Sequence, residues 1–254
     1  MATAGTRLIT FAISHYCEKA RWALDWHGCD YTEIGWPPGL HRILAKRAGA
    51  TRGSVPILLT GDQVVEGSDA IIDWAEAGAS GSRPGLCPDD LSAVIRQTES
   101  RLDKLAGVHV RRFIYSHVMP ENAHYVKPML FANTSFAHRM AGNLMWPTCI
   151  KLIVEGYKLN SVSAAESRAI LEVEFAWLEE NLRPGHGYLA GDTFTRADLT
   201  AASLLAPLAR PAEMPIYRDA ILPEALMHTF ETWKNRPVMK WVRQIYRDHR
   251  YWPD

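Results

Sequence analysis

The hydrophobic and polar positions in the first third of the chain follow the two periods of regular secondary structure. Short apolar runs bounded by turn residues are typical of strands, and apolar residues three or four positions apart are typical of helices. In chain order they predict a strand at 7–12, a helix at about 15–27, a strand at 30–34, a helix at about 39–48, strands at 57–59 and 63–65, and a helix after Ser68. The order β-α-β-α-β-β-α indicates a compact α/β unit.

Sequence signals mark the ends of these predicted helices. Gly28 is a stop for the first helix, and Ser68 is a candidate N-cap for the third. The pair Pro37-Pro38 must lie in a loop or in a first helical turn, just before the second helix. We expect the buried face of the first helix to include Tyr16, Ala20, Ala23, Leu24 and His27.

The composition changes abruptly after the last of these elements. Residues 78–90 read GASGSRPGLCPDD, and a segment so rich in Gly, Ser, Pro and Asp is typical of a linker. We therefore predict an α/β domain at 1–78, a linker at 79–90 and an all-helical domain at 91–254.

Two helices of the second part carry start signals. Ser163 and Glu166 form a capping-box pattern at the start of residues 163–182, and Thr195 and Asp198 form a similar box closed by a shorter acid. The helix after Thr195 is apolar nearly all round, which is typical of the central helix of a bundle. The predicted fold class is therefore an α/β domain followed by a helical bundle.

Charge and hydropathy argue against several classes of partner. Lys plus Arg and Asp plus Glu both total 28 in the 254 residues, so the formal net charge is zero. A neutral chain gives no reason to expect nucleic acid or an acidic membrane surface as a partner. No run approaches the roughly 18 apolar residues of a membrane span, and the first residues lack the pattern of a signal peptide.

The cysteines stand far apart, at Cys17, Cys29, Cys87 and Cys149. No two have the CxxC spacing, and the Cys–His and HExxH patterns of zinc sites do not occur in the sequence. We therefore expect free thiols, a cytoplasmic location and no metal.

Candidate chemistry lies where the first strand meets the first helix, in the stretch SHYCEKARWAL at 14–24. Ser14 precedes the helix, so its hydroxyl either caps unpaired backbone N–H groups or uses this electropositive position to stabilise a thiolate. Cys17 is either a small apolar residue in the first turn or a thiol whose pKa is lowered by the helix N-terminus. Since no second cysteine lies three residues away, Cys17 cannot run a local dithiol cycle.

Two later segments favour a binding function. Pro56 follows Val55 at the start of a strand, and a cis peptide bond there would turn the Val55 backbone outward to pair with an extended peptide. Gly67 and Ser68 open a helix whose backbone N–H groups suit a carboxylate. Ser14 could thus stabilise a thiolate, Val55 could pair with a peptide backbone, and the helix start at Ser68 could bind a carboxylate. Together these features predict a site for a small peptide that carries a thiol.

Residues 7–77 resemble the thioredoxin-like N-terminal domain of cytosolic glutathione transferases. SHYCEKARWAL resembles the family's helix start S/C-P-x-x-x-K/R-x-R, GSVP resembles its GKVP cis-proline loop, and EGSDAIIDW resembles its ESxAIxxYL segment. TRAD at 195–198 resembles the N-capping box of the family's helical second domain, whereas the likeness is thin over 91–190. The resemblance implies a thioredoxin-like domain before a helical bundle, glutathione as co-substrate and a homodimer.

The resemblance also implies roles for individual residues. It assigns Ser14 to the family's catalytic serine-or-cysteine position and Cys17 to the second cysteine of a glutaredoxin-type pair. Val55 would pair with the cysteinyl backbone of glutathione, and Ser68 would bind the γ-glutamyl carboxylate.

The chain departs from the family pattern at three positions. His15 replaces the usual proline, Ser54 replaces a lysine that often reaches the glycyl carboxylate, and Gly67 replaces the acid or glutamine before the serine. The last two changes weaken the expected contacts to glutathione. The neighbouring residues that could compensate are Arg52, His41 and Glu66.

Three functional hypotheses follow. The first is a glutathione transferase in which Ser14 activates the glutathione thiol for attack on, or thiol exchange with, a small hydrophobic electrophile. The second gives the chemistry to Cys17, through a mixed disulfide with glutathione. The third is a ligand- or protein-binding protein that keeps the fold without catalysis, because function depends on the site and not on the scaffold.

The electrophile pocket is expected within residues 105–160, a stretch long for two helices and dense in methionine and aromatic residues. Such residues form either a helical core or a soft, adaptable wall facing Ser14 across the domain boundary. The candidate pocket residues are Arg112, Tyr115 and Met119. A polar rim beside an aromatic ring suits a bulky apolar substrate that carries a polar or anionic group.

Overall fold

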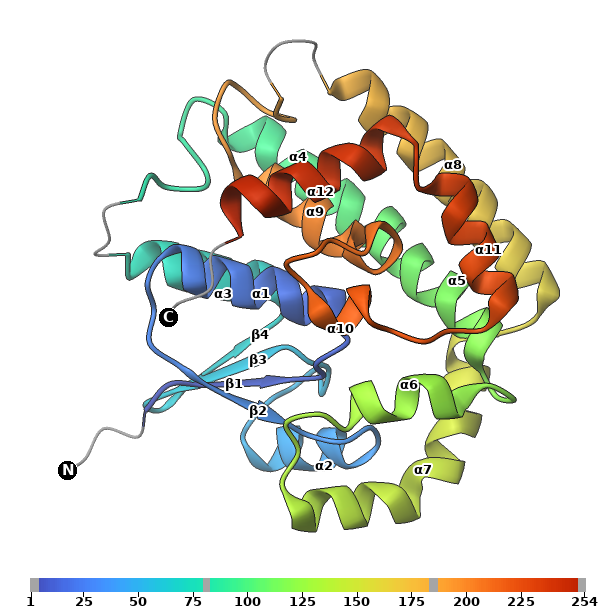
Figure 1. Ribbon diagram of the computed structural model, residues 1–254. Helices are drawn as coiled ribbons and strands as arrows, with labels where there is room; N and C mark the ends of the chain where they lie inside the picture. The colour runs from blue at the N-terminus through green and yellow to red at the C-terminus, as the bar shows by residue number, and fades with distance from the viewer. Residues whose placement is uncertain (1–4, 80–82, 183–186, 251–254) are drawn as a thin grey trace. The chain divides into compact units, whose positions relative to one another are not determined.

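The computed structural model describes residues 5–79, 83–182 and 187–250 (Figure 1). The chain forms two compact units. The first 83 residues and the separate segment Val126–Ile153 contribute to unit 1, whereas Pro84–Tyr125 and Val154–Arg250 make up unit 2. Residues 80–82 of the predicted linker lie outside the described residues.

Unit 1 contains a four-stranded sheet with the strand order β2-β1-β3-β4. β1 pairs parallel with β2 and antiparallel with β3, and β3 pairs antiparallel with β4. The strands are β1 (Arg7–Thr10), β2 (Thr32–Gly35), β3 (Ile57–Thr60) and β4 (Gln63–Glu66). The predicted strands are confirmed, although β1 ends at Thr10, earlier than predicted, and β2 begins later than its sequence pattern suggests.

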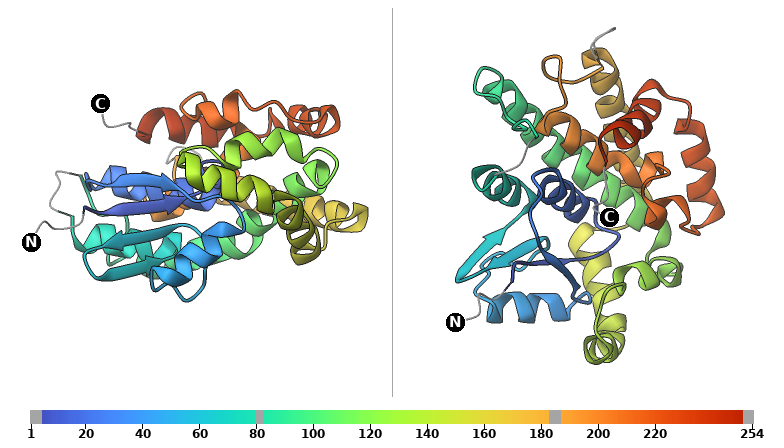
Figure 2. Two further views of the ribbon diagram at one scale, coloured as in Figure 1. Left: turned by 90° about the horizontal axis from the view of Figure 1, so that it is seen from below. Right: turned by 60° about the vertical axis from the view of Figure 1, so that its left-hand side comes forward.

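Helices cover both faces of this sheet: α1 (His15–Trp26) and α3 (Ser68–Ala77) lie on one face, and α2 (Leu40–Arg47) lies on the other (Figure 2, right). The alternation of side chains along the strands explains this arrangement, because successive residues point to opposite faces. On the α1 and α3 side, the buried cluster consists of Leu8, Ala20, Leu24, Leu58, Ile71 and Ala75. On the α2 side, it consists of Ile9, Trp36, Ala45, Ala50, Ile57 and Leu59. The predicted thioredoxin-like α/β domain is thus confirmed.

Two details of the predicted helices need correction. Ser68 is the first residue of α3 and not its N-cap, which is Gly67. Gly67 has a φ of 99°, a left-handed value that favours glycine. In α1, Tyr16 is only half-buried, whereas the other residues of the predicted face are buried: Ala20, Ala23, Leu24 and His27.

The segment Val126–Ile153 carries most of helices α6 (Ala123–Leu130) and α7 (Phe136–Tyr157). The turn between them pairs with the end of β2, where the Gly35 N–H donates to the Asn133 carbonyl at 2.9 Å and Gly35 forms an isolated bridge with Thr134. This turn therefore extends the edge of the sheet in unit 1, although it lies within the predicted all-helical domain.

The α7 helix also packs on the loop that follows β2. A Cβ atom built on Gly142 would lie 2.6 Å from Pro37 Cβ, so only glycine allows this close approach. The Cys149 thiol donates to the Pro38 carbonyl at 3.3 Å. Together these contacts hold the loop between β2 and α2.

Unit 2 is helical. Its elements are α4 (Ser92–Leu102), the π-helical segment η1 (Asp103–Gly107), α5 (Val108–Val118), α8 (Ser161–Asn181), α9 (Arg196–Ala209), α10 (Pro215–Arg218), α11 (Glu224–Trp233) and α12 (Pro237–His249). Every residue of α9 is buried, and α9 contacts α4, α5, α11 and α12. The predicted central helix of a bundle is confirmed.

One predicted capping box is confirmed and the other is wrong. At α9, the Asp198 carboxylate accepts from the Thr195 N–H and hydroxyl, each at 2.8 Å. At α8, the N-cap is Asn160, whose side chain accepts from the Ser163 N–H at 2.8 Å. Ser163 is therefore the third residue of the helix, and it returns a bond by accepting from the Asn160 N–H at 3.0 Å.

The four cysteines are free, as expected from their spacing. Within the described residues, no group of three or more His, Cys, Asp or Glu side chains could hold a metal ion. None of the described helices combines the length and the apolar character needed to cross a membrane.

Candidate functional site

Ser14 lies at the corner between β1 and α1. Its N–H donates to the Phe11 carbonyl at 2.9 Å, and its hydroxyl accepts from the Cys17 N–H at 3.3 Å. Ser14 is therefore the N-cap of α1, and its side chain is half-buried. A hydroxyl that accepts one hydrogen bond still carries a proton to donate, so capping and binding an anion are compatible uses of this side chain.

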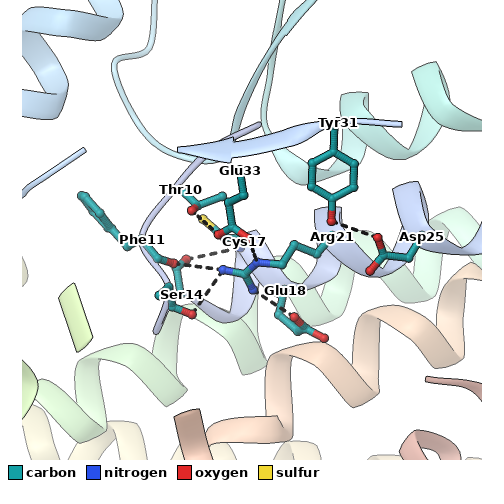
Figure 3. A network of polar contacts seen from close by, with 10 residues as sticks. Thr10, Phe11, Ser14, Cys17, Glu18, Arg21, Asp25, Tyr31 and Glu33 are labelled. Atoms are coloured by element: carbon teal, nitrogen blue, oxygen red, sulfur yellow. Dashed lines mark hydrogen bonds and ion pairs between the residues drawn. The ribbon is translucent and has the colours of Figure 1, made fainter. Parts of the chain in front are cut away.

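A buried arginine fixes the corner that carries Ser14 (Figure 3). The Arg21 Nη2 atom donates to the carbonyls of Phe11 at 3.4 Å and Ala12 at 3.2 Å. The same guanidinium pairs with Glu18 at 2.9 Å and with Glu33 at 3.0 Å. Arg21 therefore ties the β1–α1 corner to both α1 and β2.

Electrostatics favour this placement of Arg21. Burial alone would lower its pKa, but the Glu33 and Glu18 carboxylates raise the pKa well above its ordinary value, so the side chain stays charged. Glu33 also accepts a hydrogen bond from the Thr10 hydroxyl. Arg21 is part of the motif SHYCEKARWAL, but its position in the sequence does not reveal its role. Its role becomes visible only when the carbonyls of the corner are placed in space.

Cys17 lies directly beside Ser14 in the first turn of α1 and is fully buried. Burial raises the pKa of its thiol to about 11, although nearby Arg21 and the Ser14 hydroxyl act in the opposite direction. At pH 7 only about one such thiol in ten thousand is ionised. Since the thiolate is the nucleophile, these surroundings favour a packing role for Cys17 over a catalytic one.

The Val55–Pro56 peptide bond is cis, as the sequence suggested. Pro56 is buried, and its carbonyl accepts from the Gly67 N–H at 3.1 Å. Among the described residues, neither the N–H nor the C=O of half-buried Val55 has a hydrogen-bond partner. Both groups are thus available to pair with the backbone of an extended peptide.

The loop before Val55 is held by Glu66, at the end of β4. One carboxylate oxygen accepts from the Thr51 N–H at 2.6 Å and from its hydroxyl at 2.8 Å, and the other accepts from the Arg52 N–H at 2.7 Å. Slight burial raises the pKa of Glu66, but these hydrogen bonds outweigh it and lower the pKa. The Glu66 carboxylate thus organises the loop and has little capacity left for a ligand.

The N-terminus of α3 begins at Gly67 and Ser68. The Ser68 side chain is buried, and its hydroxyl has no hydrogen-bond partner among the described residues. A Cβ atom on Gly67 would lie 2.6 Å from Asp69 Oδ1, in addition to the strain of the positive φ. The local backbone therefore favours glycine at position 67, where the family usually has an acid or glutamine.

His41 lies in the first turn of α2, with its ring edge-on to Phe11 at a centroid distance of 4.9 Å. Burial, and secondarily the charge of Arg42, lowers the pKa of His41 to about 4. The imidazole is therefore neutral at pH 7. It can donate a hydrogen bond to a carboxylate. It cannot supply the positive charge of the lysine that the family often has at the position of Ser54.

The candidate pocket residues belong to unit 2. Arg112 and Tyr115 lie on α5, where Arg112 pairs with Glu166 at 3.1 Å and the Tyr115 ring contacts the Tyr157 ring at a centroid distance of 5.7 Å. Met119 ends α5 and is buried. These three residues are thus engaged within unit 2.

The methionine and aromatic residues of 105–160 belong to both units. They are divided among α5, α6 and α7. Phe131 and Trp146 are buried with ring centroids 5.6 Å apart, whereas Phe136 is 80% exposed and Met140 is 56% exposed. Part of this stretch is therefore helical core, which is one of the two interpretations that its sequence allowed.

Two family models match the chain. The glutathione S-transferase N-terminal domain matches residues 8–83, and the glutathione S-transferase C-terminal domain matches residues 145–223. Together they cover more than half of the chain. A search of curated protein sequences found no significant match.

Several solved structures share the fold. The β-etherase LigF from Sphingobium sp. strain SYK-6 is 19% identical, with 94% of this chain and 99% of that chain covered and a TM-score of 0.60. The glutathione transferase GSTFuA3 from Phanerochaete chrysosporium is 16% identical, with both chains fully covered and a TM-score of 0.64. A glutathione S-transferase from Methylobacillus flagellatus KT with glutathione bound is 14% identical, with coverage of 93% and 98% and a TM-score of 0.55. These identities are too low to transfer an activity, but the two family models and the shared fold agree, and the chain belongs to the cytosolic glutathione transferase family.

Proposed function

We propose that this protein is a glutathione transferase in which Ser14 activates the thiol of glutathione. The observation that carries the proposal is the contrast between two neighbouring side chains. Ser14 keeps a half-buried hydroxyl at the electropositive N-terminus of α1, whereas Cys17 is fully buried with a raised pKa. Of the two residues, only Ser14 has surroundings suited to stabilising a thiolate.

The remaining residues of the corner would bind the peptide. Val55 would pair through its unbonded N–H and C=O with the cysteinyl backbone of glutathione. Ser68 and the first N–H groups of α3 would bind the γ-glutamyl carboxylate, with Gly67 allowing the backbone to approach. Neutral His41 would contribute a hydrogen bond and no charge.

Simple energetics support a lowered thiol pKa at this position. A thiol with a pKa of about 8.5 is roughly 3% ionised at pH 7, and lowering its pKa to about 6.5 requires about 2.7 kcal/mol. One charge-assisted hydrogen bond contributes about 1.5–3 kcal/mol, and a helix N-terminus adds to it. Because a less basic thiolate is also less nucleophilic, orientation of the electrophile must supply the rest of the acceleration.

The electrophile is proposed to be small, hydrophobic and equipped with a polar or anionic group. Arg112, Tyr115 and Met119 remain the candidate residues for its pocket, since they combine a cation and an aromatic ring on α5 with a soft thioether at its C-cap. Replacing Tyr115 with Ala should alter the turnover of aromatic electrophiles while glutathione binding stays nearly unchanged. Equal losses in both measurements would assign Tyr115 to the structural core.

A second candidate function is a ligand-binding protein without catalysis. The observation that favours it is that two expected contacts to the glycyl carboxylate carry no charge, since Ser54 replaces a lysine and His41 is neutral. The thiol-transfer alternative through Cys17 is less favoured, because a buried thiol with a pKa of about 11 is poorly ionised.

Retention on immobilised glutathione, followed by assays of two variants, distinguishes these functions. The proposed transferase is retained, loses conjugating activity in Ser14→Ala and keeps it in Cys17→Ala. No retention would favour the binding protein with another ligand. Retention with an active Ser14→Ala and an inactive but folded Cys17→Ala would favour thiol transfer.

We further propose that the protein acts as a homodimer in the cytoplasm. The family to which the chain belongs and the prevalence of twofold association among oligomers support the dimer. Sedimentation velocity at micromolar concentration should give a dimer, and a monomer under these conditions would contradict it.

A further inference from the structure

A hollow on the α6–α7 segment of unit 1 has the composition of an anion-binding site. It has a volume of about 310 Å³ and is lined by Lys127, Pro128, Phe131, Ala132, Arg139 and Asn143. None of these residues belongs to the proposed glutathione site. The lining combines two cations with an apolar floor and contains no acidic residue.

The two cations are not neutralised elsewhere. Among the described residues, neither Lys127 nor Arg139 forms an ion pair with a carboxylate. Arg139 makes one weak bond, from Nη2 to the Thr134 carbonyl at 3.4 Å, so most of its guanidinium donors remain available. The positive charges of Lys127 and Arg139 repel each other, and a bound anion would offset this repulsion.

The Lys127 ammonium lies over two aromatic rings, near the outer limit of a cation–π contact. It lies 5.6 Å from the centroid of Phe131 and 5.9 Å from that of Trp146. The two rings pack edge to face with an interplanar angle of 87°. Such contacts leave the positive charge of Lys127 available to a ligand.

The floor of the hollow is also fixed. Phe131 is buried, and α7 approaches it closely because a Cβ atom on Gly142 would lie 2.8 Å from Phe131 Cε1. Pro128 and Ala132 add further apolar surface to the lining of the hollow. A planar apolar ligand could rest on the floor, with its charged end toward Lys127 and Arg139.

We propose that this hollow binds a small aromatic carboxylate. The volume lies at the lower end of the range for ligand pockets, which fits one or two rings. The carboxylate would accept charge-assisted hydrogen bonds from Lys127 and Arg139, with the Asn143 amide as a further donor. The site is independent of thiol chemistry, and the proposal does not rest on the transferase function.

Calorimetric titration of the full-length protein with 2-naphthoate tests the proposal. With the proposed glutathione site and the adjoining electrophile pocket saturated by S-hexylglutathione, we expect one 2-naphthoate site per chain. The neutral isostere 2-naphthamide should bind at least about tenfold more weakly, because it lacks the charge that the two cations recognise. This comparison uses only the wild-type protein, so it does not depend on how any variant folds.

Variants locate the site. Lys127→Gln and Arg139→Gln should each weaken 2-naphthoate binding by about fivefold or more. Lys151→Gln is the matched control, since Lys151 is an exposed cation on the same helix that does not line the hollow. The Lys151→Gln variant should bind 2-naphthoate with the affinity of the wild type.

A competition separates this site from the proposed glutathione site. Binding of 2-naphthoate should persist when the protein is saturated with S-hexylglutathione. Displacement by S-hexylglutathione, absence of binding, equal binding of the amide, or an equal loss in Lys151→Gln would each overturn the proposal.

Discussion

The Arg21 Nη2 atom lies 3.2 Å from the Ala12 carbonyl oxygen, inside the corner that leads to Ser14. A side chain seven residues into α1 therefore determines where that helix begins. If Ser14 activates a thiol, the placement of its hydroxyl depends on this buried guanidinium. Arg21 is thus a positioning residue, whose effect on the chemistry passes through the backbone of the corner.

Replacement of Arg21 by Met should lower the free energy of unfolding by about 3–5 kcal/mol, because the fully buried Glu18 carboxylate loses its ion pair with Arg21. Urea denaturation measures this change. Arg21→Lys keeps the charge but loses the planar fork, so it should retain more stability and still lose conjugating activity. Wild-type stability and activity in Arg21→Lys would contradict the positioning role.

Glu66→Gln tests the loop that carries Val55. The amide cannot accept all the hydrogen bonds that Thr51 and Arg52 donate to the carboxylate, so the loop should loosen. We expect KM for glutathione to rise by about threefold or more while kcat stays nearly unchanged. Steady-state kinetics with varied glutathione check this, and a loss confined to kcat would be inconsistent with it.

The pH dependence of the same variant has a defined sign. The folded-state pKa of Glu66 is lowered from 4.5, so its carboxylate stabilises the fold above that value. This stabilisation is lost as the pH falls through the lowered pKa. The difference in unfolding free energy between wild type and Glu66→Gln should therefore shrink below pH 4.5. A constant difference would mean that the carboxylate has an ordinary pKa.

Asp198→Ala should destabilise unit 2 by about 2–4 kcal/mol at pH 7, since it leaves the buried donors of Thr195 and Leu189 without an acceptor. Chemical denaturation followed by circular dichroism measures the loss. Glu180→Ala is a control on an exposed acid of α8, and its effect should stay within about 0.5 kcal/mol.

Asp198 also gives a pH dependence of the opposite sign to that of Glu66. Burial raises its pKa from 3.8 to about 6, despite the hydrogen bonds that lower it. The stability that the protonated form contributes is complete below pH 3.8 and is lost as the pH rises through about 6. The stability of the wild type relative to Asp198→Asn should therefore fall between pH 4 and pH 6. A flat difference would indicate an ordinary pKa.

The contact between α7 and the loop after β2 is tested by Gly142→Ala. The added methyl group would lie 2.6 Å from Pro37 Cβ and should cost about 1–3 kcal/mol of stability. Gly156→Ala on the same helix is the control, because a Cβ atom there meets nothing within 4 Å. It should stabilise the protein by about 0.5–1 kcal/mol through helix propensity. Equal effects of the two variants would refute the packing role of Gly142.

Local patterns predicted much of the fold. The short apolar run that contains Leu8 and Ile9 identified β1, and the Thr195–Asp198 box identified the start of α9. At α8, several capping residues lie in succession, and the pattern alone cannot show that Asn160 is chosen over Ser163. Helix ends are therefore less predictable from a sequence pattern than the helices themselves.

Long-range contacts were beyond the sequence patterns. The pairing of Gly35 with Asn133 joins residues that no local period relates, so the α6–α7 segment could not be assigned to unit 1. Likewise, the motif identified Ser14 and Cys17 as candidates but not their difference in burial. That difference depends on how α1 packs, and it is what favours Ser14 over Cys17.

The thiol pKa of bound glutathione tests the central claim most directly. It is obtained by titrating the thiolate absorbance near 240 nm in the complexes of wild type and Ser14→Ala. If Ser14 stabilises the thiolate, the pKa should be about 6.5 in the wild type and return toward about 8.5 in the variant, with a stability loss of only about 1 kcal/mol. An equal thiol pKa in both complexes would contradict the account and leave Ser14 as a helix cap alone.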